Sequence, residues 1–373
     1  MIPFNKPYLT GNESLYIEEV LKRGLFSGNN AFAKKCAAWL EDRLQCVKAI
    51  LVPSGTAALE MMMILANIGP GDEVIMPSFT FSSTANAVVL RGASPVFVDV
   101  RPDTMNIDEK QIEEAITPRT KAICPVHYAG VACDMEAIEA LASRRGLLVL
   151  PDAAQAIGSF YKDRPLCSYG HMAALSFHET KNIHCGEGGA LLINDPAFAE
   201  RAEIVMEKGT DRSKFFRGEI DKYTWVDVGS SFLTNEITSA FLYAQLEQAD
   251  KIIKRRLELW NAYYQKLEPL EKQGKLRRPG LMENCVHNGH IFWITLNDKT
   301  TRDTLMSNLK SKGINAVFHY IPLHNAPMGM RFSTRELPVT EEYAARVLRL
   351  PMFSEFSEHD VERVASGIRA HLS

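Results

Sequence analysis

In Leu147-Leu-Val-Leu-Pro-Asp152 an apolar run ends on a carboxylate, and in Ala173-Ala-Leu-Ser-Phe-His-Glu-Thr-Lys181 a second apolar run leads to an amine. Continuous apolar runs of this length, without polar alternation, predict strands that are buried on both faces of a sheet. A glycine-rich turn, Gly186-Glu-Gly-Gly189, follows the second run. The two runs therefore predict two buried strands, one ending on an acid and the other followed closely by an amine.

The surrounding sequence, from residue 48 to about residue 195, alternates short β-rich runs with amphipathic helical stretches. The predicted strands are Ala49–Pro53, Glu73–Met76, Pro95–Val100, Ala122–His127, Leu147–Asp152, Ala173–Phe177 and Ala190–Asn194. The predicted helices between them are Thr56–Ile68, Ser82–Arg91, Asp108–Ile116 and Met135–Arg145. Repeated βα units of this kind predict an α/β fold with a mostly parallel central sheet covered on both faces. Ligands of such sheets bind beyond the C-terminal ends of the strands.

Helical patterns also precede and follow this central part. Helices are predicted at Glu13–Arg23, Ala31–Leu44, Pro196–Lys208 and Asn235–Leu267, and residues 209–230 form an unusually long polar and aromatic connection. A smaller α+β unit is predicted after these, with strands at Ile291–Leu296 and near Ala316–Tyr320 and helices at Arg302–Lys312, Thr340–Leu348 and Glu358–His371. We therefore expect two domains, a large one over residues 1–250 and a small one over residues 251–373.

Composition narrows the class of protein. A hydrophobic fraction of 46% and a charged fraction of 23% are those of an ordinary soluble protein. The net charge of -3 favours neither nucleic acid nor an anionic membrane as a partner. The seven cysteines form no CxxC pair, which favours reduced thiols. No signal peptide and no membrane-spanning run is recognisable, so we expect a cytoplasmic protein.

Asp152 and Lys181 together fit the needs of pyridoxal phosphate. A carboxylate keeps the pyridine nitrogen of this cofactor protonated, so that the ring accepts electrons, and a lysine amine can bond to its aldehyde. Either residue alone carries little information. The pair, with the carboxylate at the end of one predicted strand and the amine just past another, predicts a pyridoxal phosphate site.

Several residues near the predicted strand ends are candidates for holding the rest of the cofactor. Ser54, Gly55 and Thr56 form a strand-to-helix turn whose free N–H groups suit a phosphate, although such turns are more often plain helix caps. Phe81 is placed to stack on the pyridine ring or to be a core aromatic residue. Gln155 could donate to the phenolic oxygen or cap a turn, and Ser176 could reach the phosphate.

Other polar residues are candidates for binding substrate. His178 either orders the site or is a structural histidine. The basic and aromatic segment with Arg212, Arg217, Lys222 and Tyr223 either holds a pyrophosphate and stacks a base or is a solvated loop. A second polar and aromatic cluster contains His319, Tyr320 and His324. Its histidine spacing is poor for zinc, and we expect no metal site.

Two common nucleotide motifs are missing from the chain. No GxGxxG follows the early strands, and no GxxxxGK[ST] occurs. A nicotinamide-dependent oxidoreductase or epimerase acting on a sugar nucleotide is therefore only the alternative outside the pyridoxal phosphate class.

The chain resembles the DegT-type nucleotide-sugar aminotransferases, which are fold-type I pyridoxal phosphate enzymes. The similarity runs over nearly the whole chain and is carried by an ordered set of motifs: Ile2-Pro-Phe-Asn5, Ser54-Gly-Thr56, Gly71-Asp-Glu-Val-Ile-Met-Pro-Ser78, Asp99, His127-Tyr-Ala-Gly130, Asp152-Ala-Ala-Gln155, Ser176-Phe-His-Glu-Thr-Lys-Asn182, Gly186-Glu-Gly-Gly189 and His319-Tyr-Ile-Pro-Leu-His324. This resemblance implies a nucleotide keto-sugar and L-glutamate as small-molecule substrates. It also implies a homodimer with shared active sites.

Further stretches resemble the branch of this family that aminates dTDP-4-keto-6-deoxyglucose at C4. They are Val98-Asp-Val-Arg-Pro-Asp-Thr-Met-Asn-Ile107, Val126-His-Tyr-Ala-Gly-Val-Ala132, Glu207-Lys-Gly-Thr210, Phe215-Phe-Arg-Gly218 and Asp221-Lys-Tyr-Thr-Trp225. Many relatives have Asn-Tyr-Arg before the long helix, and their asparagine reaches the cofactor phosphate of the partner subunit. This chain departs from the family there, with Ser231-Phe-Leu233, and whether Ser231 takes over that contact stays open. Amination at C3, a UDP-sugar acceptor and a catalytically silent sugar-binding protein stay open. A related sugar 3-dehydratase is disfavoured because a histidine replaces the lysine there.

Overall fold

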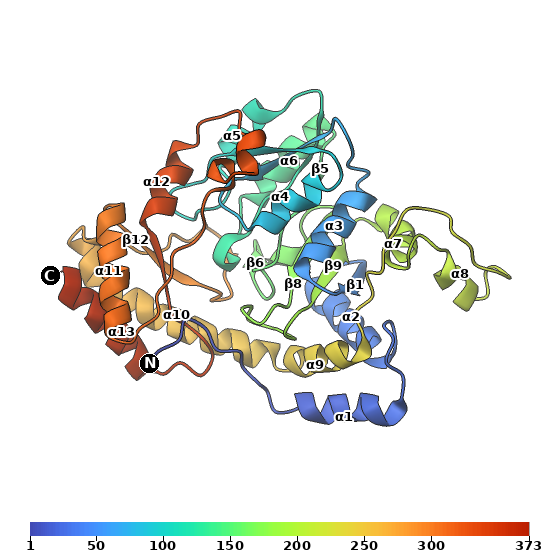
Figure 1. The fold of residues 1–373 in the computed structure, drawn as a ribbon, viewed down its shortest axis with the longest axis horizontal. Coiled ribbons are helices and arrows are strands. Elements are labelled where there is room, and N and C mark those ends of the chain that lie inside the picture. Colours follow the sequence, from blue (N-terminus) through green and yellow to red (C-terminus); the bar gives the residue numbers. More distant parts are fainter. Residues whose placement is uncertain (373) are drawn as a thin grey trace.

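The computed structural model describes residues 1–372, and its strands form a central layer with helices around it (Figure 1). Four parallel strands lie in the order β3 (Ser94–Val98), β2 (Glu73–Pro77), β4 (Thr120–Ile123) and β5 (Leu148–Val149). Three further strands lie in the order β8 (Met172–Ser176), β9 (Gly189–Ile193) and β1 (Lys48–Val52). Asp152 forms parallel bridges with Val126 on one side and Ala174 on the other, and so connects the two sets.

Strand β9 is antiparallel to both of its neighbours, β1 and β8. Gly189, its first residue, pairs with Val52 of β1 and with Ser176 of β8. A Cβ atom at Gly189 would lie 2.5 Å from the carbonyl carbon of Ser54, so only glycine lets the chain pass this close. The C-terminal ends of β1 and β8 are thereby held at one edge of the sheet.

Helices cover both faces of this sheet, and the alternation of side chains along the strands explains how. In β1, Ala49 and Leu51 belong to one buried cluster, whereas Ile50 and Val52 belong to another. The first cluster receives residues of α2 (Ala31–Leu44), α5 (Glu109–Ala115), α6 (Met135–Arg145) and α9 (Glu236–Leu246). The second receives residues of α3 (Gly55–Leu65), α4 (Ser82–Val89) and α7 (Ala199–Met206). The α/β fold predicted from the sequence is confirmed.

The C-terminal part contains a smaller antiparallel sheet with its own buried cluster. Its strands lie in the order β10 (Leu276–Arg277), β12 (Phe292–Leu296) and β13 (Val347–Leu350). Helices α10 (Ala249–Lys272), α11 (Lys299–Ser311) and α13 (Glu358–Leu372) contribute to the cluster, and α12 (Pro338–Arg346) leads into β13. Ile2 is buried in the same cluster, so the first residues of the chain pack here. A domain boundary near residue 250 stays a prediction.

Most predicted helices and strands are confirmed within a few residues, and α1 (Glu13–Arg23), α2 and α6 have the predicted bounds. The single helix expected over Asn235–Leu267 is wrong, because α9 ends at Leu246 and α10 begins at Ala249. Glu247 keeps helical angles, with φ −60° and ψ −24°, and only Gln248 departs from them. Such a short break leaves the apolar periodicity almost unchanged, which is why the pattern does not reveal it.

Two further predictions near the C-terminus need correction. The helix expected over Thr340–Leu348 ends at Arg346, because the next residues pair with β12 as β13. The strand expected near Ala316–Tyr320 is reduced to one bridge between Val317 and Arg349. Unpredicted short elements are α8 (Arg212–Phe216), β6 (Phe160–Tyr161), β7 (Arg164–Pro165), β10 and β11 (Cys285–Val286), with 3-10 turns at Tyr128–Gly130, Leu166–Ser168, Leu323–Asn325 and Gly329–Arg331. The helix predicted over Pro196–Lys208 begins as a 3-10 turn at Pro196–Phe198 and continues as α7. Over residues 1–372, we find no helix with the length and apolar character needed to cross a membrane.

Candidate active site

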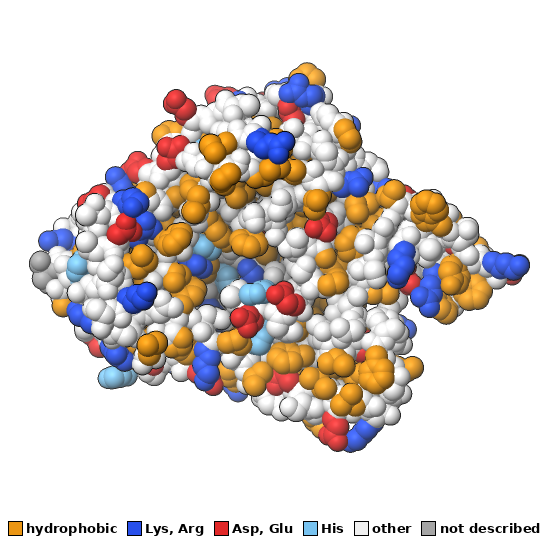
Figure 2. Space-filling model, in the orientation of Figure 1, with side chains coloured by type: hydrophobic (Ala, Val, Ile, Leu, Met, Phe, Trp, Pro, Cys, Tyr) orange, Lys and Arg blue, Asp and Glu red, His pale blue; other side chains and the backbone are white. Residues whose placement is uncertain are grey.

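A cavity of about 840 Å³ opens where the central sheet meets the C-terminal part of the chain. Figure 2 shows the molecule hollowed near the middle of one face, with histidine and acidic side chains around the hollow. The predicted site residues that line the cavity are Ser54, Gly55, Thr56, Phe81, Asp152, Gln155, Ser176, His178, Lys181, His319 and Tyr320. They come from segments more than 250 residues apart in the sequence.

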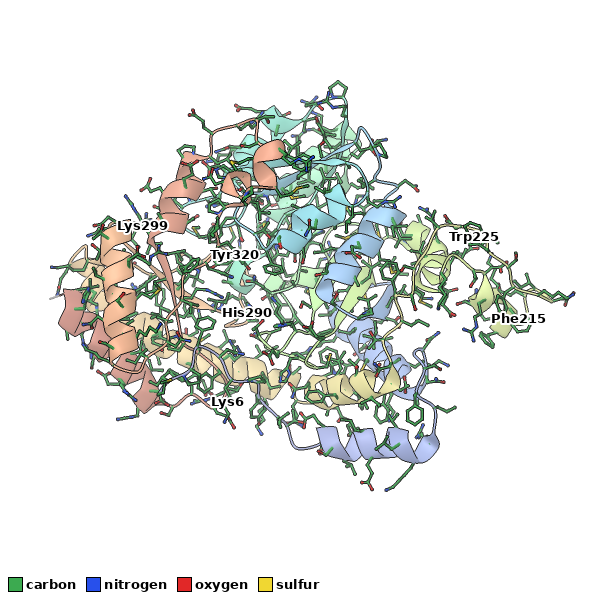
Figure 3. The ribbon with its side chains drawn as sticks, in the orientation of Figure 1. Lys6, Phe215, Trp225, His290, Lys299 and Tyr320 are labelled. Atoms are coloured by element: carbon green, nitrogen blue, oxygen red, sulfur yellow. The ribbon has the colours of Figure 1, made fainter. Side chains whose placement is uncertain are left out.

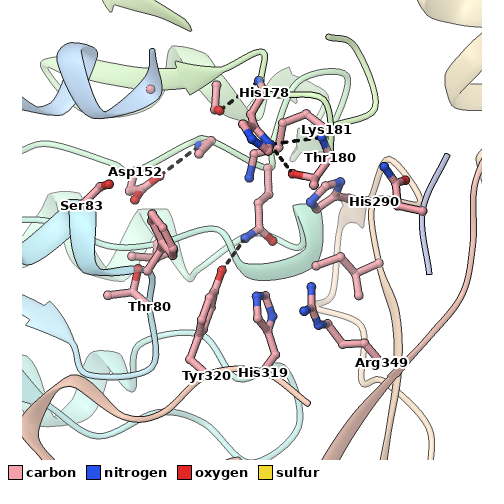
Figure 4. Close-up of a pocket in the computed structure, with 18 of the residues that line it drawn as sticks. Thr80, Ser83, Asp152, His178, Thr180, Lys181, His290, His319, Tyr320 and Arg349 are labelled. Carbon is pink, nitrogen blue, oxygen red and sulfur yellow. Dashed lines mark hydrogen bonds between the residues drawn. The ribbon is translucent and has the colours of Figure 1, made fainter. Parts of the chain in front are cut away.

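Asp152 lies at the connection between the two sets of central strands, and its carboxylate faces the cavity (Figure 4). The Thr84 hydroxyl donates to its Oδ2 at 2.7 Å, and the backbone N–H of Ala154 donates to its Oδ1 at 3.1 Å. Burial raises the pKa of this carboxyl group, while these hydrogen bonds and the charge of Lys181 lower it in part. A protonated pyridine nitrogen next to Asp152 would compensate the cost of a buried negative charge.

Lys181 extends into the same cavity from the loop that follows β8. Burial lowers the pKa of its amine to about 8, Asp152 opposes this shift, and Arg349 adds to it. The backbone N–H of Lys181 donates to the carbonyl of His178 at 2.8 Å, so a tight turn holds the base of the side chain. An amine with this pKa is unprotonated far more often near neutral pH than an ordinary lysine amine, as a nucleophile or base requires.

The hydroxyl groups of several residues collect where β1 and β8 end and α3 begins. Ser54 caps α3 by accepting from the N–H of Ala57 at 3.0 Å. The Thr56 hydroxyl lies 2.7 Å from that of Ser83. A Cβ atom at Gly55 would lie 2.8 Å from the Cβ of Ser176, so the glycine brings the helix terminus up to β8. Free N–H groups, the helix dipole and these hydroxyls make a corner suited to a phosphate.

Aromatic side chains and one amide border the space between this corner and Lys181. Phe81 is 60% exposed although it begins a helix beside the core, and its ring lies 6.4 Å from that of Tyr320. Gln155 donates to the Tyr320 hydroxyl at 3.4 Å and accepts from the N–H of Ala129 at 2.7 Å. His319 lies 3.1 Å from the Tyr128 hydroxyl. These contacts are drawn in part in Figure 4, where Tyr320 and His319 stand opposite Asp152 and Lys181.

The residues of the cavity fit pyridoxal phosphate. The glycine cradle at Gly55 admits a phosphate to the start of α3. Asp152 offers a carboxylate to the pyridine nitrogen, and Lys181 offers an amine to the aldehyde. Phe81 presents an accessible aromatic ring to the same space. Each functional group of the cofactor therefore has a chemically matched partner.

Six predicted site residues lie outside this cavity: Ser231, Arg212, Arg217, Lys222, Tyr223 and His324. Ser231 is exposed and forms a bridge with Glu207. Arg212 pairs with Glu207 at 3.2 Å, and Arg217 pairs with Glu203 at 2.6 Å. Residues 209–230, called the arm below, include α8. Figure 3 shows Phe215 and Trp225 of the arm well away from His290 and Tyr320.

Lys222 and Tyr223 are exposed on this arm, where the Tyr223 ring lies 5.7 Å from that of Phe215. His324 is buried elsewhere, with its Nδ1 2.6 Å from the Ser78 hydroxyl and its Nε2 3.1 Å from a Glu341 oxygen. In this single chain, therefore, the cavity contains every predicted cofactor residue except Ser231, and the basic and aromatic arm lies outside it.

Sequence reasoning missed several residues of the cavity. They are Thr80, Ser83, Arg256, His290 and Arg349. Thr84 was also missed; it does not line the cavity, but its hydroxyl donates to Asp152. His290 lies 2.9 Å from the Asn182 side chain, and burial and nearby positive charges lower its pKa well below the usual range. The Ser82-Ser83 pair at a helix start was a usable signal for Ser83. Arg256 and Arg349 sit within a helix and a strand, where no local pattern marks them.

Comparison with known proteins agrees with this geometry. A sequence model of the DegT/DnrJ/EryC1/StrS aminotransferase family matches residues 7–369. The aminotransferase TlmJ from Streptoalloteichus hindustanus is 31% identical, with a TM-score of 0.91 over 100% of this chain and 99% of TlmJ. DesV from S. venezuelae is 31% identical, with a TM-score of 0.91 over 100% of this chain and 98% of DesV.

A third similar structure is a DegT DnrJ EryC1 StrS aminotransferase from Brucella abortus. It is 32% identical, with a TM-score of 0.88 over 96% of this chain and 95% of the other. Both the family match and these structures cover nearly the whole chain, and the family match includes every cavity residue except Phe4 and Asn5. The chain belongs to the DegT/DnrJ/EryC1/StrS aminotransferase family, and it is an enzyme that uses pyridoxal phosphate.

Proposed function

We propose that this aminotransferase moves the amino group of L-glutamate to C4 of dTDP-4-keto-6-deoxy-D-glucose. The products are dTDP-4-amino-4,6-dideoxy-D-galactose and 2-oxoglutarate. The proposal is supported by the stretches that resemble dTDP-4-amino-4,6-dideoxygalactose transaminase of the enterobacterial common antigen pathway, among them Val98–Ile107 and Val126–Ala132. Aminotransferases that act on a UDP-sugar, or that aminate C3, are the alternatives.

The observation that carries the proposal is the size and lining of one cavity. Its volume of about 840 Å³ exceeds the space that a cofactor alone fills and is within the range of pockets that enclose small organic ligands. Asp152 and Lys181 mark one part of the cavity, and His319 and Tyr320 border another part. A sugar substrate has hydroxyl and carbonyl oxygens that such side chains can bind. We assign His178, His319 and Tyr320 to this role.

The protein's own residues account for the proton movements. When bound, pyridoxal phosphate supplies a carbon that accepts the amino group and a ring that takes up electrons. Asp152, fixed by Thr84, keeps a proton on the ring nitrogen. Lys181 Nζ takes the proton from Cα of the amino donor and delivers it to the carbon that receives the amino group. In the second half of the reaction, the same amine moves protons in the opposite direction for the keto-sugar. Ser54, Thr56 and Ser176 hold the phosphate throughout.

We further propose that the enzyme is a cytoplasmic homodimer in which each subunit completes the other's active site. The residues on the arm support this, because Phe216 is 67% and Trp225 is 77% exposed, and large exposed aromatics mark interaction surfaces. In a dimer, Ser231 would contact the partner's cofactor phosphate. Arg212, Arg217, Lys222 and Tyr223 would contact the partner's nucleotide. His324 would act on the substrate-binding side of the cavity indirectly, through its hydrogen bond with Ser78.

Isotope transfer tests the proposed substrates. The protein is incubated with ¹⁵N-labelled L-glutamate and dTDP-4-keto-6-deoxy-D-glucose, and the product is examined by NMR. The proposal predicts a sugar with ¹⁵N on C4 and an axial amine. Nitrogen on C3, or transfer only when a UDP-sugar replaces the dTDP-sugar, would refute it in favour of one of the alternatives.

A further inference from the structure

His290 is a buried histidine of the cavity for which the mechanism above has no use. It lies two residues before β12, beside the loop that carries Thr180 and Lys181 (Figure 4). Its Nδ1 is 2.9 Å from Oδ1 of Asn182, the residue that directly follows Lys181. Within residues 1–372, its Nε2 has no hydrogen-bond partner and is not fully enclosed, so it opens on the cavity. The imidazole is therefore tied to the lysine loop through one nitrogen, and its other nitrogen is available.

The hydrogen bonds of Asn182 decide which nitrogen of His290 carries the proton. Asn182 Nδ2 donates to the carbonyl of Asn288 at 2.9 Å, and a carbonyl oxygen can only accept. Oδ1 of Asn182 therefore faces His290 as an acceptor, and Nδ1 of His290 must be the donor. Burial, with nearby positive charges, lowers the pKa of His290 well below its usual range, so the ring is neutral and has a single proton. Nε2 consequently offers a lone pair.

The neighbouring backbone holds this ring in place from two sides. The N–H of His290 donates to Oδ1 of Asn288 at 3.0 Å, and its carbonyl accepts from Arg256 at 2.6 Å. Nδ2 of Asn288 in turn donates to the carbonyls of Gln155 at 2.7 Å and Ile157 at 2.9 Å. The lone pair of Nε2 is therefore fixed relative to the loop of Gln155, which also lines the cavity.

Lys181 is the neighbour that this lone pair suits. Among the charged groups that act on the His290 ring, Lys181 has the largest effect, ahead of Arg256 and Arg349. Within residues 1–372, no acceptor forms a hydrogen bond with the Lys181 amine. The amine thus has donors without an acceptor, and Nε2 is an acceptor without a donor. Because a lysine side chain is a flexible four-carbon stem, a rotation of this stem can bring the two together.

We infer that His290 is a positioning residue that holds the amine of Lys181 after the cofactor has released it. Nε2 accepts one N–H of the amine, which limits the rotation of the stem and directs the amine toward the reacting carbon. The inference rests on the proposed role of Lys181 as the base that moves the proton. No bond is made or broken at His290. Its contribution is geometric, because an amine that samples many positions is seldom in the one that suits proton transfer.

Two substitutions separate this role from a purely structural one. In His290→Asn, the side-chain N–H group stays near the place of Nδ1 and can still donate to Asn182, but the acceptor in the cavity is lost. In His290→Gln, the longer side chain brings an oxygen near the place of Nε2 and gives up the contact with Asn182. His359→Asn is the control, because His359 is an exposed residue of α13 that does not line the cavity. Cofactor content and the thermal midpoint show whether each variant is folded.

The first measurement is the acidity of the Lys181 amine. Each protein is loaded with pyridoxamine phosphate, which leaves this amine free, and is labelled with fluorodinitrobenzene at roughly pH 6 to 10, around the pKa of about 8. Mass spectrometry of the Lys181 peptide gives the labelling rate. A hydrogen bond to Nε2 stabilises the ammonium form, so its loss in His290→Asn should raise the acid dissociation constant about tenfold. The charges that act on Lys181, those of Asp152 and Arg349, are the same in every variant.

This measurement is separable from the test of the proposed function, because it uses neither a sugar nor an amino donor. His290 can therefore be judged whichever keto-sugar the enzyme accepts. The proposed function fails instead when the wild type is bleached by L-glutamate but is not restored by the dTDP-keto-sugar.

The second measurement is the stopped-flow reaction of each protein, loaded with pyridoxal phosphate, with L-glutamate. We expect the apparent Kd for L-glutamate to stay near the wild-type value in His290→Asn. The proton transfer that follows should be roughly ten- to a hundredfold slower, as expected for a misplaced reacting group. His290→Gln should recover most of the rate and the wild-type acidity, and His359→Asn should match the wild type in both.

A measurement on the wild type does not depend on whether His290→Asn folds. NMR of the protein labelled with ¹⁵N-histidine, with the His290 signal identified by its absence in His290→Gln, should show the proton on Nδ1. A proton on Nε2 would leave no acceptor and would overturn the inference. So would an unchanged acid dissociation constant in His290→Asn. A His290→Gln variant impaired as much as His290→Asn, or more, would equally overturn it, because the bond to Asn182 would then be what matters.

Discussion

Gly55 and Ser176 approach so closely that a Cβ atom at Gly55 would lie 2.8 Å from the Cβ of Ser176. The contact joins the first residue of α3 to the last residue of β8, two elements more than 100 residues apart in the sequence. It places the free N–H groups of a helix beside the hydroxyls that we assign to the cofactor phosphate. The corner therefore depends on the absence of a side chain at residue 55.

Gly55→Ala should weaken cofactor binding. The added methyl group must push Ser176 or the start of α3 away, at a cost of about 1–3 kcal/mol. This corresponds to a rise in the Kd for pyridoxal phosphate of roughly tenfold or more. Gly69→Ala is the control, because a Cβ there meets no atom within 4 Å. Equal affinity of Gly55→Ala and wild type, measured by cofactor titration, would contradict the assignment of the phosphate corner.

Lys181→Ala should abolish turnover while the folded protein still binds pyridoxamine phosphate. The side chain carries the reacting amine, whereas the phosphate corner and Asp152 are untouched. Steady-state rates and equilibrium dialysis of the cofactor separate the two properties. Lys162→Ala is the control, since Lys162 lies on the surface and pairs with Glu136. Turnover by Lys181→Ala near that of the wild type would rule out the mechanism.

The buried amine of Lys181 should also make the stability of the cofactor-free protein depend on pH. Its pKa is about 8 in the folded protein and 10.5 in an ordinary lysine. Between these values the unfolded chain binds more protons at Lys181, so the free energy of unfolding rises with pH. Urea denaturation from pH 8 to pH 10 (about the window between the two pKa values) should show this contribution in wild type and lack it in Lys181→Met. Equal slopes for the two proteins would show that the amine is not perturbed.

Asp152→Asn should slow the reaction with L-glutamate by roughly a hundredfold or more, as expected when a preorganised charge is lost from an active site. Thr84→Val removes only the hydroxyl that donates to the carboxylate at 2.7 Å. It should cost about tenfold or less, the value of one hydrogen bond. Stopped-flow spectra after mixing with L-glutamate give both rates. The reverse order of severity would argue that Asp152 does not face the ring nitrogen.

The proposed dimer makes a prediction for Trp225. Trp225→Glu places a charge on an aromatic side chain that is 77% exposed in the single chain. If this surface contacts a second subunit, the substitution should give monomers in sedimentation experiments and lower the cofactor affinity. Leu90→Glu changes a residue that is 67% exposed on another part of the molecule and serves as the control. A wild-type protein that sediments as a monomer would eliminate the shared site.

Local sequence patterns predicted most of the central fold, because each βα unit is stabilised by residues close in sequence. Met135–Arg145 shows this, since Asp134 caps its start and Gly146 adopts the left-handed conformation after its end. The predicted helix Thr340–Leu348 extends too far, into the first two residues of the strand Val347–Leu350, because the pairing partner of this strand, β12, lies about 55 residues earlier. The pairing of Val347 with Thr295 is a long-range contact, and helical periodicity does not report it.

The difference between local sequence patterns and long-range contacts also decides which residues of the site could be predicted. Ser54, Asp152 and Lys181 were predictable because they stand at strand ends, where the fold class itself places ligands. Arg349 and His290 come from the C-terminal part, and their approach to Lys181 depends on how the small sheet packs over the large one. Conversely, Arg212 and Arg217 of the arm were predicted to bind substrate only because basic and aromatic residues are frequent in that segment. Within one chain it lies outside the cavity.

The proposed mechanism requires that Lys181 holds the cofactor and releases it to an amino donor and then to a keto-sugar. The most direct measurement is the visible absorption spectrum of the purified protein with pyridoxal phosphate, before and after L-glutamate and then dTDP-4-keto-6-deoxyglucose are added. We expect a band that depends on Lys181, is bleached by L-glutamate and returns with the keto-sugar. A spectrum without such a band, even with excess pyridoxal phosphate, would contradict the role of Lys181 and the mechanism built on it.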